Sequence, residues 1–346
     1  MKNKKILILV TQLEPAGAQK AASILSKMLT TIGIQNNLVF LYEKTKFDYL
    51  QVNDIDFEII SKKNKASLFD IPVYIKEISR LNPEVILAFT HYAIVIALIQ
   101  KLINPQIKII ANHRNPRYSY PLIARIFLSI TRKLVFLNTF VSEDTKNSFF
   151  PLQGRTIINP IGFTKKIKSK EFSIPESKFL LCVGRLSDQK NYFEVLEEMI
   201  KYKGEIKLKI VGDGPLKKDI ISFIKEFDLN EKVELLGIQT HDQIIELLKN
   251  TSCFLMPSKF EGTSNSLIEA LYYAPRVAIN NIPSLIETSF YLGKNYSLIK
   301  GIDFNNWIEL FNNLESGNIQ PKENSIREKF DNQTFLKNFV EIIEKC

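Results

Sequence analysis

Short apolar runs alternate with helix-length segments along the whole chain. In the first half, the runs predict strands and the segments between them predict helices. The expected strands are Ile6–Val10, Leu38–Leu41, Val85–Ala88, Ile107–Ala111 and Leu134–Leu137, and the expected helices lie at about 18–32, 70–81, 92–103 and 119–132. Strands separated by helices are typical of a parallel sheet that is covered on both faces.

The same alternation begins again after a polar, lysine-rich stretch, Thr164–Lys178. The expected strands of the second half are Phe179–Val183, Leu208–Val211, Val233–Leu236, Cys253–Met256 and Val277–Ile279, with helices near 191–202, 215–227, 241–249 and 265–273. The tail, Asn332–Lys345, predicts one amphipathic helix with its apolar face formed by Phe335, Phe339, Ile342 and Ile343.

A chain of 346 residues is long enough for two domains of ordinary size. The pattern predicts an α/β protein with two Rossmann-like, doubly wound parallel-sheet domains. Their expected limits are residues 1–163 and 179–330, with a linker at 164–178 and a C-terminal helix at 331–346. Two such domains are expected to face a cleft, with ligands at the carboxyl ends of the strands.

Charge is spread unevenly over the two halves. Residues 1–163 hold 21 Lys and Arg against 11 Asp and Glu, a net charge of +10, whereas residues 164–346 hold 25 against 26, a net charge of −1. A basic domain attracts an anionic membrane surface, and the alternative is charge that serves only solubility. Nucleic acid is not an expected partner, because no basic and aromatic recognition motif accompanies the charge.

Three cysteines, Cys182, Cys253 and Cys346, form no metal or disulfide pattern and indicate a reducing compartment. The apolar run Ile6–Val10 is too short for a signal peptide, and the longest one, Ala93–Ile103, is interrupted by Gln100 and Lys101. We therefore expect a cytoplasmic protein, with peripheral attachment to the inner face of the plasma membrane as a further possibility.

The first motif of chemical interest is the segment Gly184–Asn191, directly after the strand that ends at Val183. Gly184 permits a sharp turn, and Arg185 and Lys190 place two cations near a helix start, where backbone amides already favour an anion. A diphosphate fits this arrangement. The alternative is a surface turn with two solvated cations.

Two weaker motifs follow the next two strands. Gly212-Asp213-Gly214-Pro215 is a strand-to-helix turn, and the strand Val233–Leu236 is closed by Gly237. Each of them alone is also typical of a plain turn.

The strongest motif is Pro257–Ala270, in which a buried strand leads through a loop of small residues into a helix. Thr263, Ser264 and Asn265 are good helix-capping residues, and with Gly262 they present free amides to phosphate or sugar hydroxyls. The carboxylates of Glu261 and Glu269 suit the hydroxyl groups of a sugar and a ribose. The neighbours of Glu269 in the sequence are apolar, so a charge without a binding partner would be costly there.

Taken in order, the patterns G-R-L-x-x-x-K-N, G-D-G-P, V-x-L-L-G and S-x-x-E-G-x-x-x-x-x-x-E-A resemble the retaining GT-B glycosyltransferase family GT4. The resemblance implies that Arg185 and Lys190 hold the diphosphate of a nucleotide-sugar. It also implies that Glu261, with the backbone after it, holds the transferred sugar, and that Glu269 binds the ribose.

The first half resembles the family less closely. Pro15–Gln19 is similar to its G-G-A-E/Q turn, in which backbone approaches the donor phosphate, although Ala16 replaces the first glycine and only Gly17 remains. The segment Ala111–Pro116 resembles the family's loop near the reaction centre, so His113 and Arg114 are expected to contact sugar or acceptor. His91 follows another strand and is expected to line the cleft.

The resemblance predicts a retaining glycosyltransferase that moves a hexose or N-acetylhexosamine, UDP-linked by preference, onto a glycan or a polyprenyl-diphosphate-linked acceptor in surface polysaccharide biosynthesis. It implies front-face attack, and the cationic side chains make a cofactor or divalent ion unnecessary. A nucleotide-sugar epimerase with the same architecture is the alternative. Ala274 and Arg276 depart from the family pattern at a turn expected near the cleft.

Overall fold

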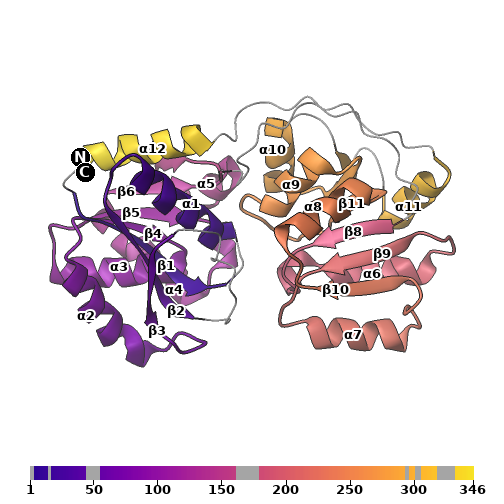
Figure 1. Ribbon diagram of the computed structural model, residues 1–346, viewed down its shortest axis with the longest axis horizontal. Helices are drawn as coiled ribbons and strands as arrows, with labels where there is room; N and C mark the ends of the chain where they lie inside the picture. The colour runs from indigo at the N-terminus through magenta and orange to yellow at the C-terminus, as the bar shows by residue number, and fades with distance from the viewer. Residues whose placement is uncertain are drawn as a thin grey trace. The chain divides into compact units, whose positions relative to one another are not determined.

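The computed structural model describes residues 4–14, 17–43, 55–160, 179–292, 296–300, 305–317 and 332–346. The chain divides into two compact units (Figure 1). The first contains Met1–Gly162 together with Phe330–Cys346, and the second contains Phe163–Lys329. The predicted linker at 164–178 lies outside the described residues, as do Pro15 and Ala16.

The first unit is built on a parallel sheet with the strand order β3-β2-β1-β4-β5-β6-β7. Its strands are β1 Ile6–Leu13, β2 Asn36–Glu43, β3 Phe57–Ser61, β4 Val85–Phe89, β5 Lys108–His113, β6 Leu137–Phe140 and β7 Gly154–Thr156. Its helices are α1 Gly17–Thr31, α2 Ile71–Leu81, α3 His91–Ile103, α4 Leu122–Thr131, α5 Glu143–Ser148 and α12 Asn332–Lys345.

Alternate residues of each strand point to opposite faces of this sheet, so two separate cores form. Ile6, Ile8 and Val10 belong to the core under α1 and α12, whereas Leu7 and Leu9 belong to the core under α2, α3 and α4. The predicted tail helix is confirmed at its expected bounds, and it lies beside α1 on the first unit (Figure 1). The last helix of the chain therefore completes the first domain.

One predicted strand of the first unit was misplaced. The apolar run Leu134–Leu137 was expected to be a strand, but β6 runs over Leu137–Phe140. Its two polar residues are buried because they hydrogen-bond to the neighbouring strand. Asn138 Oδ1 lies 3.0 Å from His113 Nε2, and Thr139 Oγ1 accepts from Asn112 Nδ2 at 2.9 Å.

The second unit contains another parallel sheet, in the order β10-β9-β8-β11-β12-β13. Its strands are β8 Phe179–Val183, β9 Lys207–Val211, β10 Val233–Gly237, β11 Cys253–Met256, β12 Val277–Asn280 and β13 Ser297–Ile299. Its helices are α6 Tyr192–Lys201, α7 Lys217–Glu226, α8 His241–Asn250, α9 Asn265–Tyr273, α10 Pro283–Leu292 and α11 Trp307–Glu315. The predicted class of two doubly wound, Rossmann-like domains is thus confirmed.

Helices α6, α7 and α11 share one apolar core with the second sheet, and α8, α9 and α10 are neighbours on its other face (Figure 1). All strands of this sheet are parallel, so their carboxyl ends meet at one edge. The loops after β8, β9, β10 and β11 carry the sequence motifs and therefore gather at that edge.

Ala274 and Arg276 were expected at a turn near the cleft, and this prediction was wrong. Arg276 precedes β12 and donates from Nη1 to the carbonyl oxygen of Ser252, 3.1 Å away, just before β11 begins. Helix α9 has by then returned the chain to the amino ends of the strands. Ala274 and Arg276 therefore lie at the edge opposite to the motif loops.

Candidate functional site

Three turns at the carboxyl edge of the second sheet are hydrogen-bonded in series. The amide of Gly184, after β8, donates to the carbonyl of Val211 at 3.0 Å, and the amide of Gly212, after β9, donates to Gly237 at 2.8 Å. Gly212 has a φ of +140°, and a Cβ atom there would lie 2.0 Å from the carbonyl oxygen of Gly184. Gly212 and Gly237, which belong to the two weaker sequence motifs, therefore set the path of the turn that begins at Gly184.

Lys190 and Glu261 form a buried ion pair, although they are 71 positions apart in the chain. Lys190 Nζ lies 2.7 Å from Glu261 Oε1, and Ser258 Oγ donates to the same oxygen at 2.9 Å. The side chains are 13% and 8% exposed. A charge pair this far from water is well ordered, because each partner neutralises the other in a medium of low dielectric constant.

The loops that carry these two residues are interlocked. The amide of Lys259 donates to the carbonyl of Gln189 at 2.9 Å, and Gln189 Nε2 donates to the carbonyl of Phe260 at 3.0 Å. Lys259 Nζ also pairs with Asp188 Oδ1 at 2.6 Å. The loop after β8 and the loop after β11 are therefore held as one polar platform.

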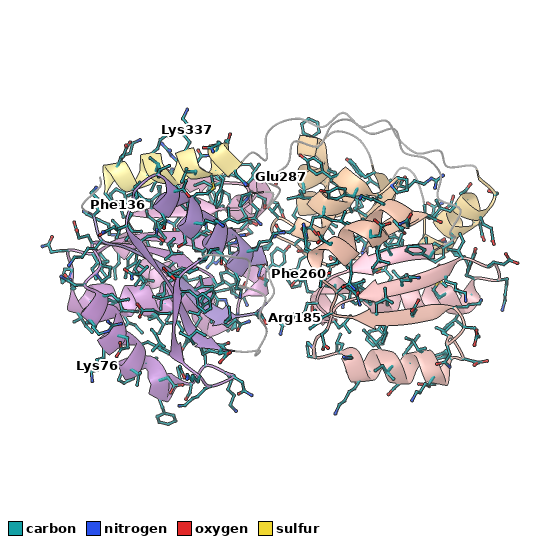
Figure 2. The ribbon with its side chains drawn as sticks, viewed as in Figure 1. Lys76, Phe136, Arg185, Phe260, Glu287 and Lys337 are labelled. Atoms are coloured by element: carbon teal, nitrogen blue, oxygen red, sulfur yellow. The ribbon has the colours of Figure 1, made fainter. Side chains whose placement is uncertain are left out.

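Arg185 extends from the same platform and is exposed. Figure 2 shows Arg185 and Phe260 on the same side of the second unit. The turn thus presents one exposed cation, Arg185, and one nearly buried cation, Lys190. A diphosphate approaching the platform would meet both.

Helix α9 begins within the platform. Ser264 is its N-cap, accepting a hydrogen bond from the amide of Leu267, and Gly262, Thr263 and Asn265 flank it. The remaining amides of the first turn have no partner within the helix, as at every helix start. An anion or a sugar hydroxyl is favoured there.

Glu269 lies one turn further along α9 and is buried, with 8% of the residue exposed. Its Oε1 lies 3.9 Å from Nδ1 of His241, the first residue of α8. From the sequence His241 was expected to begin an exposed helix and was given no role. Its contact with Glu269 depends on the packing of α8 against α9.

The other predicted site residues lie in the first unit, also at the carboxyl edge of its sheet. His113 ends β5 and is 1% exposed, with its ring against Phe140 at 5.1 Å and Phe149 at 4.3 Å between centroids. Burial lowers the pKa of His113 to about 4. The neutral ring therefore forms part of the core and is linked to β6 by its hydrogen bond to Asn138.

Arg114 ties the end of β5 to the start of α1. Its guanidinium donates to Asn112 Oδ1 at 3.2 Å, to the carbonyl oxygen of Gly17 at 3.4 Å and to Asn159 Oδ1. It is 8% exposed, and within the described part of the chain no carboxylate forms an ion pair with it. Burial lowers its pKa to about 9. Arg114 thus links the end of β5 to the first residue of α1.

His91 is the first residue of α3, directly after β4. Its ring packs on Tyr120 with centroids 4.9 Å apart, and burial lowers its pKa. The preceding residue, Thr90, has a φ of +89°, which is rare and costly for a β-branched side chain. Gly17, His91, His113 and Arg114 therefore form a second cluster, at the ends of β1, β4 and β5.

The second unit matches a known protein family. Residues 163–329 match the family model described as glycosyl transferases group 1. Over 96 residues, the chain is 40% identical to the N-acetylgalactosamine-N,N'-diacetylbacillosaminyl-diphospho-undecaprenol 4-alpha-N-acetylgalactosaminyltransferase of Campylobacter jejuni, an alignment that spans 28% of this chain and 26% of that protein.

Two longer matches cover both units. The chain is 25% identical over 288 residues to the amylovoran biosynthesis glycosyltransferase AmsD of Erwinia amylovora, spanning 80% of this chain and 81% of that one. It is also similar to the crystal structure of Anabaena HepE in complex with UDP and glucose, with a TM-score of 0.79, 16% identity and coverage of 99% and 100%. The structural likeness confirms the predicted GT-B fold.

Proposed function

We propose that the chain, whose residues 163–329 match the family model described as glycosyl transferases group 1, is a retaining glycosyltransferase that acts on a nucleotide-sugar. The proposed reaction transfers a hexose or N-acetylhexosamine from a UDP-linked donor to a glycan or lipid-linked acceptor in surface polysaccharide biosynthesis. UDP is favoured because the similar HepE structure holds UDP. The name of the Campylobacter relative includes a diphospho-undecaprenol acceptor, and that of the Erwinia relative refers to amylovoran biosynthesis.

The observation that carries the proposal is the interlocked platform with its pair of Lys190 and Glu261. Arg185 and Lys190 are proposed to bind the donor diphosphate, together with the amides at the start of α9. Glu261 and the backbone of Gly262 to Asn265 are proposed to hold the sugar. Glu269, buried one turn further on, is proposed to accept hydrogen bonds from the ribose hydroxyls.

In the proposed reaction, the bond between the sugar C1 and the diphosphate oxygen breaks as the acceptor oxygen bonds to C1 from the same face. The electron pair of the broken bond stays on the diphosphate, which takes the proton of the acceptor hydroxyl. Arg185 and Lys190 stabilise the charge that develops there. Glu261 is not a nucleophile in this scheme, because its carboxylate is already engaged by Lys190 and Ser258.

Roles in binding the donor and the acceptor are also proposed for residues of the first unit. Arg114 donates to the carbonyl oxygen of Gly17, whose backbone is proposed to approach the donor phosphate. His91 is proposed to line the acceptor side. For His113 the burial supports a narrower role than direct contact with the sugar: it orients the end of β5 through Asn138.

The proposed site of action is the cytoplasmic face of a membrane. Residues 1–163 carry a net charge of +10, which favours an anionic surface. Within the described part of the chain, no helix is both long and apolar enough to cross a bilayer. The proposed attachment is peripheral and is argued from the positive charge of residues 1–163.

The test is an incubation of purified protein with UDP- and GDP-sugars, with and without a lipid-linked acceptor. Acceptor-dependent release of UDP, with an NMR-assigned product of the donor's anomeric configuration, is the expected result. Chelation of divalent ions by EDTA should leave the rate unchanged, because arginine and lysine supply the positive charge. Release of UDP without any product, or an inverted product, would contradict the mechanism.

The epimerase alternative finds no support in the comparisons above, since both named relatives are transferases. The same assay tests it. An isomerised sugar nucleotide that forms without acceptor and without release of UDP would favour the epimerase.

A further inference from the structure

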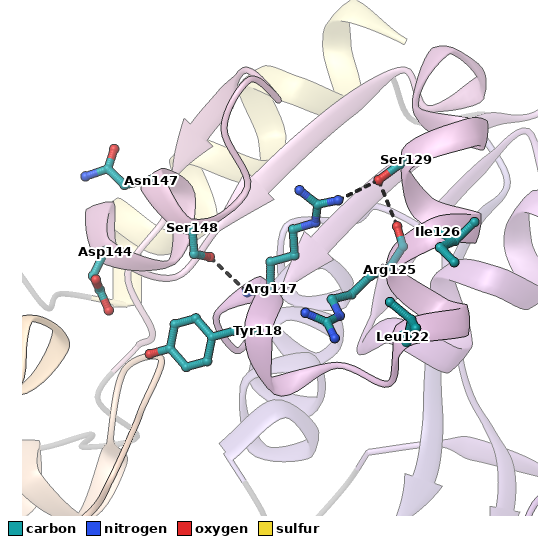
Figure 3. Close-up of a pocket in the computed structure, with 9 residues that line it drawn as sticks. All are labelled: Arg117, Tyr118, Leu122, Arg125, Ile126, Ser129, Asp144, Asn147 and Ser148. Carbon is teal, nitrogen blue, oxygen red and sulfur yellow. Dashed lines mark hydrogen bonds between the residues drawn. The ribbon is translucent and has the colours of Figure 1, made fainter.

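A pocket of about 720 Å³ opens in the first unit, between α4, α5 and the short 3-10 helix Arg117–Ser119 (Figure 3). Arg117 and Arg125 contribute two cationic side chains to its wall. Leu122 and Ile126 contribute apolar side chains, and Asn147 and Ser148 contribute small polar ones. None of these residues belongs to the two clusters described above.

Neither arginine is neutralised by an ion pair in the described part of the chain, and the side chain of Arg117 is held in place by a hydrogen bond. Arg117 donates from Nη2 to Ser129 Oγ at 2.8 Å, and its backbone amide donates to Ser148 Oγ at 2.9 Å (Figure 3). Arg125 Nε is buried and has no hydrogen-bond partner. A buried donor without a partner costs free energy, which an anionic ligand would recover.

Asp144 is the acidic residue in the lining. Two guanidinium groups against one carboxylate leave the pocket with a net positive charge. The planar donor fork of arginine matches the oxygens of a phosphate group. The chemistry of the pocket therefore points to a phosphate ester.

Large apolar side chains are exposed beside the pocket, mostly on α4. Ile123 is 83% exposed, Leu122 63%, Tyr118 58% and Ile126 51%. Apolar groups gathered in this way next to cations are unfavourable in water and fit the boundary between headgroups and acyl chains. A free phosphate ion would not use them, whereas a phospholipid would use both features.

We propose that this pocket binds the headgroup phosphate of an anionic phospholipid, with the exposed side chains of α4 in contact with the acyl region. Arg117 and Arg125 hold the phosphate, and Ile123 and Leu122 enter the membrane. This inference rests on the proposed function at a membrane. It is tested separately, because lipid binding is measured without the transfer reaction.

The experiment is sedimentation of the full-length protein with vesicles of phosphatidylglycerol and phosphatidylcholine, compared with vesicles of phosphatidylcholine alone. Binding to the anionic vesicles is expected. Each of Arg117→Gln and Arg125→Gln should weaken it about fivefold, and the double variant about 25-fold, since a basic residue near such a surface contributes about 1 kcal/mol. Ile123→Ser should weaken binding to a similar extent without changing any charge.

Matched controls lie on α7 of the second unit. Lys218→Gln removes the same charge from an exposed position, and Ile221→Ser removes an apolar side chain that is 37% exposed. Neither control should change vesicle binding. Circular dichroism of each variant checks that the fold is retained.

The strongest rival surface is the 3-10 helix Leu68–Asp70, where Phe69 is 91% exposed. Loss of vesicle binding in Phe69→Ser, with normal binding in the Arg117 and Arg125 variants, would overturn the proposal. Equal binding to both kinds of vesicle would also overturn it. Transfer to a detergent-solubilised acceptor tests the proposed function separately, so the two failures are distinguishable.

Discussion

The pair of Lys190 and Glu261 has a structural role as well as a proposed catalytic one. Lys190→Met leaves the carboxylate of Glu261 only 8% exposed with a single hydroxyl partner, so we expect a stability loss of about 3 kcal/mol. We also expect transfer to slow about 100-fold or more, since a group that stabilises the leaving diphosphate is lost. Urea unfolding followed by fluorescence and a UDP-release assay measure the two effects.

The double variant Lys190→Met and Glu261→Gln separates these roles. With both charges removed, the stability should return to within about 1 kcal/mol of the native protein, whereas transfer should stay slow. A double variant that regains activity along with stability would show that the pair serves the fold alone.

Gly212 is expected to be sensitive for a steric reason. In Gly212→Ala the new Cβ would meet the carbonyl oxygen of Gly184 at 2.0 Å, and backbone cannot move away as a flexible side chain can. We expect a stability loss of about 3 kcal/mol and weaker UDP binding, because the Gly184 turn is displaced.

Gly237→Ala is the control for that substitution. Gly237 has a φ of +67°, but nothing lies within 4 Å of the Cβ position, so only the backbone conformation is penalised, by about 1 kcal/mol. Thermal unfolding with and without UDP compares the two. If both variants lose the same stability and the same affinity, the close approach to Gly184 does not matter.

At the scale of elements, the contact between β5 and β6 predicts a pH dependence of the first unit. Burial lowers the pKa of His113 to about 4, whereas an unfolded histidine titrates near 6.5. Below pH 6.5 the unfolded chain gains a proton that the folded one does not, so stability falls as the pH is lowered toward 4. The loss between pH 7 and pH 5 should be about 2 kcal/mol.

The variant His113→Gln tests this origin, because glutamine can keep the hydrogen bond to Asn138 but does not titrate. Its unfolding free energy is measured with urea at pH 7 and at pH 5. Between these two values it should fall by about 2 kcal/mol less than that of the native protein. An unchanged dependence in the variant would assign the effect to other groups.

The same contact explains why β6 was predicted three residues too early. Apolar patterning favoured Leu134–Leu137, since Asn138 and Thr139 look like loop residues in the sequence. They are buried because each finds a partner on β5, and a partner distant in the chain is invisible to local pattern. The missed strands β3 and β7 lie at the sheet edges, where a short or half-exposed strand has no continuous apolar run.

The sequence was more informative about the second unit. Strands β8 and β11 have the bounds that the apolar runs predict, because both are buried on both faces. The motif order placed Lys190 and Glu261 at one sheet edge, and the structure brings them into contact. The proximity of His241 to Glu269 depends on the packing of α8 against α9, and the tie of Arg114 to Gly17 depends on the fold of the first unit. Neither could be predicted from spacing.

At the scale of the whole molecule, the final helix makes the first unit discontinuous in sequence. Phe339 of α12 is fully buried and stacks on Phe89 of β4, with centroids 6.0 Å apart. Phe339→Ala should therefore cost the first unit about 4 kcal/mol, because it opens a cavity in the core under α1 and α12.

The single tryptophan allows the two units to be followed separately. Trp307 is buried in the core of the second unit, so its fluorescence reports the unfolding of that unit, whereas circular dichroism reports both. In Phe339→Ala we expect an early transition by circular dichroism, with the Trp307 transition and UDP stabilisation unchanged. Phe311→Ala, in the same core as Trp307, should do the reverse and shift the fluorescence transition. In Phe339→Ala, the Trp307 fluorescence transition could shift as far as the early transition seen by circular dichroism. That result would mean that the two units unfold together. Helix α12 would then stabilise the donor-binding unit as well as its own.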